Sequence, residues 1–242
     1  MKKYGIVGYP LAHSFSQKYF TQKFADEKIR DAVFETYEMS DIKGIEPLLN
    51  DKNLQGFCIT IPHKKNMLPY LFERTSAVKE TGACNCVRIR DGKLFGYNTD
   101  VIGFEKSFTA HLQPHHKRAL VLGTGGAAAA VTYVLRKLGI DYRCVSTSKK
   151  PETLAYSELD KNILDAHSII INCTPLGTYP KTDVAPAIPY QFITSKHYLF
   201  DLVYNPPLTK FLALGKEKGA FVQNGYDMLI FQAEENWKIW NE

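Results

Sequence analysis

Two short segments in the first hundred residues carry side chains that can move a proton to or from an alcohol. Thr60-Ile61-Pro62-His63-Lys64 offers an amine, and Asn98-Thr99-Asp100 offers a carboxylate. A lysine at the reacting oxygen can supply or accept the proton, and a carboxylate beside it can orient the lysine and bond a neighbouring hydroxyl. Each residue also has an ordinary structural explanation, since exposed lysines are common and Asp100 could cap a helix that starts at Val101.

A glycine-rich turn in the second half of the chain has the pattern of a dinucleotide-binding site. It follows an apolar run at 118–122 and precedes an alanine-rich run at 127–138. The glycines permit a tight turn against a pyrophosphate, and unpaired N–H groups at the start of the next helix point toward the anion. A plain strand-to-helix turn is the alternative, because a bare glycine pattern is common. The expected dinucleotide contacts are Gly123, Thr124, Gly125, Gly126 and Ala127.

The residues after the next expected strand favour NADP over NAD. A NAD site usually places Asp or Glu about 20 residues after the glycine turn, where the acid binds the ribose hydroxyls. Residues 144–150 contain no acid. We expect the hydroxyls of Ser146 and Thr147 and the ammonium groups of Lys149 and Lys150 to hold a 2′-phosphate. A solvated loop with two ordinary surface lysines is the alternative.

Alternating strand and helix signals surround the polar segments of the first hundred residues. The pattern predicts strands at 4–7, 33–37 and 56–61, a hairpin of 86–90 with 93–97 around Asp91-Gly92, and helices beginning after Ser14 and at Pro62. Ser14 could act only as the cap of its helix. This alternation is typical of an α/β domain with a mixed sheet.

The second half has the pattern of successive βαβ units. Strands are predicted at 118–122, 142–145, 168–172 and 198–203, with a helix at 127–138 that ends before Gly139 and a last helix at 227–240. We therefore expect an α/β protein with two domains. Residues 1–100 would form a substrate-binding domain, completed by 226–242, and residues 101–225 a Rossmann-like, doubly wound, dinucleotide-binding domain.

The composition is that of an ordinary globular protein that needs no metal or disulfide to fold. Of 242 residues, 45% are hydrophobic and 23% charged, and no apolar run approaches the roughly 18 residues of a membrane span. The first residues lack the apolar stretch of a signal peptide, so we expect a cytoplasmic protein with reduced cysteines and no metal site. The net charge is +5, and the basic residues are not gathered into one run. This distribution favours binding of anionic small molecules over binding of nucleic acid.

Five short segments, in order along essentially the whole chain, resemble those of the shikimate dehydrogenase family. They are Pro10-Leu11-Ala12-His13-Ser14-Phe15-Ser16, Thr60-Ile61-Pro62-His63-Lys64, Ala83-Cys84-Asn85, Asn98-Thr99-Asp100, and Asn224-Gly225-Tyr226-Asp227-Met228-Leu229 with Gln232. One such segment has little weight, because each could arise for structural reasons alone. Five segments in the family's order are far more specific.

The resemblance implies a role for each matching residue. Lys64 and Asp100 would form the catalytic pair. The expected substrate contacts are Ser14 and Ser16 to a carboxylate, Thr60, Asn85 and Gln232 to ring hydroxyls, and Tyr204 to the substrate from the cofactor domain. The residues expected near the nicotinamide are Thr174, Val203 and Gly225.

The resemblance also implies an activity, the NADP-dependent, reversible reduction of 3-dehydroshikimate to shikimate in chorismate and aromatic amino acid biosynthesis. A quinate/shikimate dehydrogenase that uses NAD is one alternative, and a non-catalytic ligand-sensing module of the same fold is another. The presence of both Lys64 and Asp100 argues against the sensing module, because binding alone would not require the pair. We expect a monomer or homodimer whose partners are small molecules, with neither nucleic acid nor membrane bound.

The chain departs from the family pattern at several positions. Cys58 stands where Asn is common, and Cys86 where Thr is common. Thr147 is the expected counterpart of an arginine that clamps the 2′-phosphate, so Lys149 or Lys150 would have to replace it as point charges. None of these departures removes an expected catalytic group.

Overall fold

The computed structural model describes residues 1–12, 14–148 and 151–242, and it divides into two compact units. Unit 1 contains Met1–Ile102 and Gln232–Glu242, and unit 2 contains Gly103–Phe231. The sequence analysis placed these boundaries at 100 and 226. Helices α4 (Thr99–Thr109) and α8 (Tyr226–Asn241) each begin in one unit and end in the other.

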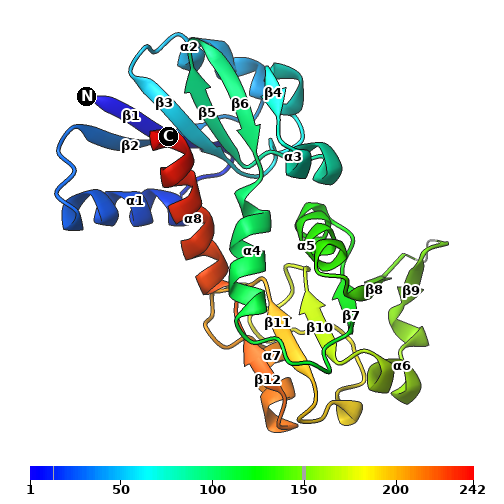
Figure 1. Ribbon diagram of the computed structural model, residues 1–242. Helices are drawn as coiled ribbons and strands as arrows, with labels where there is room; N and C mark the ends of the chain where they lie inside the picture. The colour runs from blue at the N-terminus through cyan, green and yellow to red at the C-terminus, as the bar shows by residue number, and fades with distance from the viewer. Residues whose placement is uncertain (13, 149–150) are drawn as a thin grey trace. The chain divides into compact units, whose positions relative to one another are not determined.

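Unit 1 is built on a mixed sheet of six strands (Figure 1). In order across the sheet these are β2 (Ala32–Glu38), β1 (Lys2–Gly8), β3 (Leu54–Ile59), β5 (Cys86–Arg90), β6 (Lys93–Tyr97) and β4 (Glu73–Arg74). β1 is parallel to β2 and β3, whereas β5 is antiparallel to β3 and β6. Strands β5 and β6 form the expected hairpin, in which Asp91 and Gly92 take φ angles of 50° and 69°. The predicted mixed sheet is confirmed.

Helix α1 (Phe15–Asp26) lies beside α8 on one face of this sheet (Figure 1). Their aromatic side chains pack against β1 and β2. The Phe20 ring stacks on Phe34 with centroids 4.7 Å apart, and Tyr4 stacks on Trp240 at 5.2 Å. Trp240 Nε1 also donates to the carbonyl oxygen of Val87 at 3.0 Å, which ties α8 to β5. Residues one turn or more earlier on α8 are thereby held against the sheet.

Short helices cover the face of this sheet that is opposite to α1 and α8. They are η1 (Ile42–Ile45), α2 (Glu46–Leu49), η2 (Leu68–Tyr70) and α3 (Ser76–Thr81). Phe57 and Val87 pack with Ile45 and Val78 there, whereas Cys58 and Cys86 pack on the α1–α8 side. This alternation follows from the two-residue period of a strand.

The segment after β3 differs from the prediction. The sequence predicts a helix beginning at Pro62, but residues 61–67 form a run of turns. The buried side chains of His63 and Met67 anchor these turns, and the Met67 N–H bonds to the His63 carbonyl oxygen at 2.9 Å. Burial of two side chains from a short loop thus overrides the local helix signal.

Unit 2 contains a six-stranded sheet in which every pairing is parallel (Figure 1). Its strands, in order, are β12 (Phe221–Gln223), β11 (Tyr198–Asp201), β10 (Ile169–Asn172), β7 (Arg118–Leu122), β8 (Asp141–Ser146) and β9 (Thr153–Ala155). Numbered within the unit, the order is 6-5-4-1-2-3, which is that of the Rossmann fold. The predicted doubly wound sheet is confirmed, although the sequence analysis missed β9 and β12.

Helices α5 (Gly126–Lys137), α6 (Lys161–Ala166) and α7 (Lys210–Glu217) connect these strands. Leu120, Ile170 and Leu199 of the central strands are fully buried in one hydrophobic cluster. α5 ends before Gly139, whose φ of 67° suits a residue without a side chain. Among the described residues, no helix has the length and apolar character needed to cross a membrane.

Candidate active site

Lys64 and Asp100 form a hydrogen-bonded ion pair in unit 1. Lys64 Nζ donates to Asp100 Oδ2 at 2.6 Å. Lys64 lies in the turns after β3, where its carbonyl oxygen accepts from the Cys84 N–H at 2.8 Å. Asp100 lies within the first turn of α4 and does not precede it, so the cap at Val101 considered above is not formed. The two side chains are 33% and 20% exposed, so solvent can still reach the pair.

Asn85 fixes the orientation of the Asp100 carboxylate. Its Nδ2 donates to Asp100 Oδ1 at 2.9 Å, and its Oδ1 accepts from the Thr99 N–H at 2.7 Å. Asn85 is buried directly before β5. Because the main-chain N–H occupies Oδ1, Nδ2 must face Asp100. Each oxygen of the Asp100 carboxylate therefore accepts from one donor. The two bonds hold the carboxylate in a single orientation, with Oδ2 toward Lys64.

Hydrogen bonds continue from Thr99 to α8. Thr99 Oγ1 donates to Asn236 Oδ1 at 2.6 Å. Asn236 Nδ2 donates to Gln232 Oε1 at 3.3 Å and to Cys58 Sγ at 3.2 Å. Burial raises the pKa of the Cys58 thiol to about 12, which keeps it protonated near neutral pH. We call Lys64, Asp100, Asn85, Thr99, Asn236 and Gln232 the polar network.

The two serines expected to bind a carboxylate have different surroundings. Ser14 caps α1, because its Oγ accepts from the Gln17 N–H at 3.3 Å. A hydroxyl that accepts a bond can still donate its own hydrogen, so capping does not exclude a ligand role. Ser16 is buried in the first turn of α1, where its hydroxyl lies near the Cys58 thiol and acts to lower the pKa of that thiol. Ser16 thus adjoins the polar network.

Thr60 directly follows β3 and is held by the neighbouring strand. Its N–H bonds to the Val7 carbonyl oxygen at 2.9 Å. Its methyl group occupies the space beside Gly8, where an added Cβ would lie only 2.3 Å from Thr60 Cγ2. Gly8 therefore allows Thr60 to pack closely at the carboxyl end of β1.

The glycine turn of unit 2 joins β7 to α5. Gly123 has a φ of 106°, which L side chains rarely adopt, and a Cβ there would lie 3.2 Å from Thr174 Cγ2. A Cβ on Gly125 or Gly126 would meet nothing within 4 Å. The backbone requires glycine at 123, whereas the other two glycines leave open space before the helix. Thr124, Gly125, Gly126 and Ala127 are all exposed there.

A buried carboxylate, Asp201, organises the loops that follow β10 and β11. Its Oδ1 accepts from Asn172 Nδ2 at 2.9 Å and the Val203 N–H at 3.0 Å, and its Oδ2 accepts from Thr209 Oγ1 at 2.6 Å. Burial raises the pKa of Asp201 to about 6, and these bonds oppose the rise. Asn172 Oδ1 in turn accepts from Thr174 Oγ1 at 2.6 Å. Thr174 and Val203 are thus held by one set of hydrogen bonds.

Gly225 and Tyr204 border the same loop. The Gly225 N–H bonds to the Val203 carbonyl oxygen at 3.2 Å. A Cβ on Gly225 would lie 2.3 Å from the Leu202 carbonyl oxygen, so a larger residue would displace the loop. Tyr204 is half-buried, and burial raises the pKa of its hydroxyl.

A pocket of about 570 Å³ lies beyond β8, at the same edge of the sheet as the glycine turn. Its lining residues are Thr147, Ala155, Tyr156, Ser157, Thr174, Leu176, Ala185 and Ala187. Thr147 and Thr174, two expected cofactor contacts, therefore share one pocket. Ser146 is buried at the end of β8, and its Oγ accepts from the Ser148 N–H at 3.3 Å. Lys149 and Lys150 lie outside the described residues.

These features fit an adenine dinucleotide. The 12-residue helix α5 presents its N-terminus beside glycines that leave room for phosphate oxygens. The pocket beyond β8 has alanine, leucine and tyrosine side chains that suit a flat aromatic base. The carboxyl edge of a doubly wound sheet is where such ligands bind.

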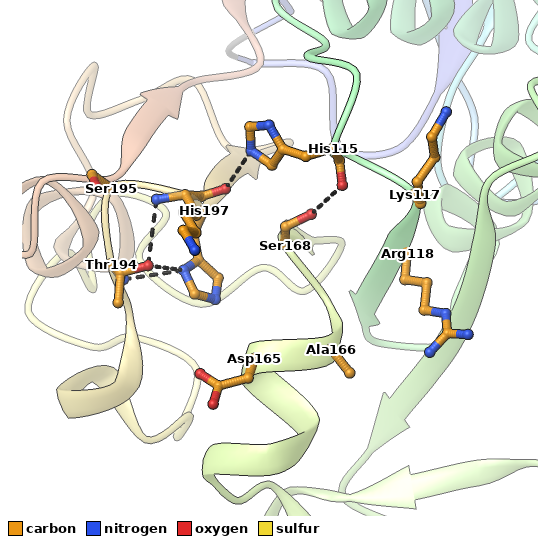
Figure 2. Close-up of a pocket in the computed structure, with 10 residues that line it drawn as sticks. His115, Lys117, Arg118, Asp165, Ala166, Ser168, Thr194, Ser195 and His197 are labelled. Carbon is orange, nitrogen blue, oxygen red and sulfur yellow. Dashed lines mark hydrogen bonds between the residues drawn. The ribbon is translucent and has the colours of Figure 1, made fainter.

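A second pocket of unit 2, of about 800 Å³, lies near the amino ends of the strands (Figure 2). His197 and His115 lie in it, but both imidazoles bond to main chain. His197 Nδ1 accepts from the Thr194 N–H at 3.0 Å, and His115 Nε2 donates to the Lys196 carbonyl oxygen at 3.1 Å (Figure 2). The pocket begins where β7 begins, at Arg118, whereas the glycine turn follows the end of that strand. We therefore assign it no part in cofactor binding.

The cysteine and acidic side chains of the described residues form neither disulfides nor a metal-binding cluster. All five cysteines are free thiols. Within residues 1–12, 14–148 and 151–242, no group of three or more His, Cys, Asp or Glu could hold a metal ion.

Comparison with known proteins identifies the family. Residues 6–87 match the model of the shikimate dehydrogenase substrate binding domain. A shikimate dehydrogenase (NADP(+)) of Methanococcus maripaludis is 38% identical over 258 residues, which cover 99% of this chain and 91% of the relative. The chain belongs to the shikimate dehydrogenase family. A second such relative, from Clostridium beijerinckii, is 36% identical and covers 100% of this chain and 93% of its own length.

The fold agrees with this membership. The shikimate 5-dehydrogenase of Thermus thermophilus, solved in complex with NADP(H) and shikimate, matches with a TM-score of 0.87 at 27% identity. The match covers 99% of this chain and 93% of that one. The family resemblance inferred from five short segments is confirmed.

The expected site residues fall into two groups, one in each unit. In unit 1, Lys64, Asp100, Asn85 and Gln232 share the polar network, and Ser16 adjoins it through Cys58. In unit 2, the described cofactor residues surround the glycine turn and the loops after β8, β10 and β11.

The sequence analysis missed three polar residues that hold these groups: Asn236, Asn172 and Asp201. Each is completely buried. A polar residue among apolar neighbours was the available signal. Asn236 lies between Ala233, Ile239 and Trp240, which are all buried on the same helix, and Asp201 ends the apolar strand β11.

Proposed function

We propose that this protein catalyses the reversible, NADP-dependent reduction of 3-dehydroshikimate to shikimate, a step in chorismate and aromatic amino acid biosynthesis. The observation that carries the proposal is the Lys64–Asp100 pair. Its atoms are 2.6 Å apart, and Asn85 fixes the carboxylate from the other side. A lysine held in this way suits proton transfer to an oxygen, which mere binding of a ligand would not need.

In the direction of reduction, NADPH supplies a hydride to the carbonyl carbon of the substrate. Lys64 donates a proton to the carbonyl oxygen, which becomes the hydroxyl of shikimate. One N–H of the ammonium group is used by Asp100, so two remain for the substrate. The neutral amine then recovers a proton from solvent, which reaches the 33% exposed side chain. Asp100 accepts a hydrogen bond from the hydroxyl next to the reacting carbon.

The remaining residues of unit 1 bind the substrate. Ser14 and Ser16 donate their hydroxyl hydrogens to its carboxylate. Thr60 and Gln232 bind ring hydroxyls. Asn85 acts mainly on Asp100, and its second Nδ2 hydrogen can reach a ring hydroxyl.

Unit 2 binds the cofactor. The N–H groups at the start of α5 and the turn Gly123–Ala127 hold the pyrophosphate, and Ser146 and Thr147 hold the adenosine ribose. Lys149 and Lys150 balance the charge of the 2′-phosphate. The loops carrying Thr174, Val203 and Gly225 contact the nicotinamide, and Tyr204 reaches the substrate. We further propose that the protein is cytoplasmic and works as a monomer or homodimer.

Isotope transfer tests the reaction directly. Purified protein is mixed with 3-dehydroshikimate and NADPH that carries deuterium at the reacting carbon of the nicotinamide. The product is analysed by mass spectrometry. Shikimate with one deuterium on the new carbinol carbon is expected, from one of the two cofactor diastereomers only. Unlabelled product from both diastereomers, or no product, would contradict hydride transfer by this protein.

A further inference from the structure

Asn236 lies at the centre of the polar network and matches none of the family segments. Its side chain is 0% exposed. Its Oδ1 lies 2.6 Å from Thr99 Oγ1, and its Nδ2 lies 3.3 Å from Gln232 Oε1 and 3.2 Å from Cys58 Sγ. Both polar atoms of the buried amide are therefore paired, as burial requires.

The distances fix which way the Asn236 amide faces. Hydrogen bonds of the O–H···O kind have a most common length of about 2.7–2.8 Å, whereas N–H···O bonds are longer, near 2.9–3.0 Å. The 2.6 Å contact with Thr99 thus suits a hydroxyl that donates to Oδ1. The longer contacts with Gln232 and Cys58 suit N–H donors. The amide nitrogen of Asn236 accordingly points at Gln232.

This orientation determines what Gln232 can offer. Asn236 and Gln232 are four residues apart, so they share a face of α8. Gln232 Oε1 accepts from Asn236. The amide nitrogen Nε2 of Gln232 is therefore what remains for other partners, and it can only donate. Without Asn236, the Gln232 amide could rotate and present its oxygen instead.

Asn236 is also connected, through Thr99 and Asn85, to the reacting groups. Thr99 supplies its N–H to Asn85 Oδ1 at 2.7 Å, and Asn85 Nδ2 holds Asp100 Oδ1 at 2.9 Å. Since the Thr99 hydroxyl has a single hydrogen, its bond to Asn236 leaves Asn85 Oδ1 paired with the main chain. The orientation of Asn85 is therefore set by the Thr99 N–H and not by Asn236, so an effect of Asn236 on the substrate passes through Gln232.

We propose that Asn236 is a positioning residue that fixes the Gln232 amide with its N–H donors toward the substrate. The proposal rests on the proposed function, because it takes Gln232 as a substrate contact. It predicts that Asn236 contributes to recognition of a ring oxygen that accepts a hydrogen bond. It also predicts that Asn236 acts through Gln232 and has no separate contact with substrate.

A double-mutant cycle tests this. The dissociation constant for shikimate is measured by calorimetry for wild type, Gln232→Ala, Asn236→Ala and the double variant, each saturated with NADPH, which cannot oxidise shikimate. Each single change should weaken shikimate binding roughly five- to tenfold, the value of one neutral hydrogen bond. The double variant should be no weaker than Gln232→Ala alone, because the effects act in series. NADP⁺ binding should stay within twofold in all four proteins.

Two further variants separate positioning from general damage. Asn241→Ala removes an asparagine on the same helix whose Nδ2 donates to the Trp237 carbonyl oxygen at 2.7 Å and whose Oδ1 accepts from the Tyr4 hydroxyl at 3.3 Å. Neither partner belongs to the polar network, so this change should leave shikimate binding unchanged. Asn236→Asp keeps the volume and the acceptor for Thr99, but once ionised, in titrations at pH 8, its carboxylate cannot donate to Gln232. It should weaken shikimate binding as much as Asn236→Ala.

The outcomes are distinct. Multiplicative effects of the two alanine changes, or Asn236→Asp with wild-type affinity, would overturn the positioning role. A wild type that binds shikimate without turning it over would refute the proposed function, while the cycle would still decide the role of Asn236. A wild type that does not bind shikimate at all would overturn both.

Discussion

Replacing Asp201 by asparagine tests how the cofactor loops of unit 2 are held. Asp201 is 0% exposed and accepts three hydrogen bonds. The Oδ1 of an asparagine at this position can still accept from Asn172 and Val203. Its amide NH₂ can donate to the Thr209 hydroxyl, which is able to accept. The variant therefore removes a buried charge while keeping the hydrogen-bonded frame of the loops.

The magnitude follows from the pKa of Asp201, which burial raises from 3.8 to about 6. Between these values the folded chain holds a proton that the unfolded chain has released. The free energy of unfolding of wild type therefore falls as pH rises through this window and stays lower above it. One pKa unit is worth about 1.4 kcal/mol, so the ionised carboxylate costs about 3 kcal/mol. The Asp201→Asn variant lacks this cost.

The assay is urea unfolding followed by far-ultraviolet circular dichroism between pH 4 and pH 7. Tryptophan fluorescence is unsuitable, because both tryptophans, Trp237 and Trp240, lie in unit 1. The stability of Asp201→Asn relative to wild type should increase by about 2 kcal/mol from pH 4 to pH 7, because part of the full effect is already present at pH 4. Asp141→Asn, which changes an 85% exposed side chain, serves as control and should show a much smaller trend. A difference between Asp201→Asn and wild type that does not vary with pH would refute the reasoning.

Three further predictions concern activity and binding. Lys64→Ala should lower turnover by roughly 10²–10⁴-fold with less than about tenfold change in the KM for shikimate; equal losses in both would contradict its role in proton transfer. Replacing Lys149 and Lys150 together by alanine should weaken NADP⁺ binding but leave NAD⁺ binding nearly unchanged in calorimetric titrations, and equal weakening would show that they do not bind the 2′-phosphate. Gly126→Ala should unfold at the same urea concentration as wild type, since an added Cβ meets no atom within 4 Å. The variant should nevertheless bind NADP⁺ about tenfold more weakly, because the methyl group fills the space before α5. Unchanged affinity would mean that the pyrophosphate binds elsewhere.

The sequence predicted those parts of the fold that are set by the residue types of a short segment. Asp91-Gly92 supplies the positive φ angles of the β5–β6 hairpin, and Gly123 supplies the φ of 106° between β7 and α5. The three-residue edge strands β9 and β12 could not be recognised in this way, because their main chains are ordered by the strands beside them. The turns at 61–67 depend on burial of His63 and Met67, which a propensity for helix does not include.

The candidate site shows the same division. Lys64, Asp100 and the glycine turn have recognisable neighbours in sequence, so motifs found them. Asn236 is 137 positions from its partner Thr99, and Asp201 is 29 positions from Asn172. A polar residue among apolar neighbours can be noticed in the sequence, but its partner lies far along the chain, and only the three-dimensional structure brings the two together.

The measurement that tests the central claim most directly is an initial-rate comparison with purified protein. Shikimate and quinate are each oxidised with NADP⁺ and with NAD⁺, and formation of reduced cofactor is followed. We predict rapid turnover with shikimate and NADP⁺, and slow or undetectable turnover with the other three pairs. Equal or faster turnover with quinate or NAD⁺ would contradict the proposed specificity, and no turnover with any pair would contradict the proposed function.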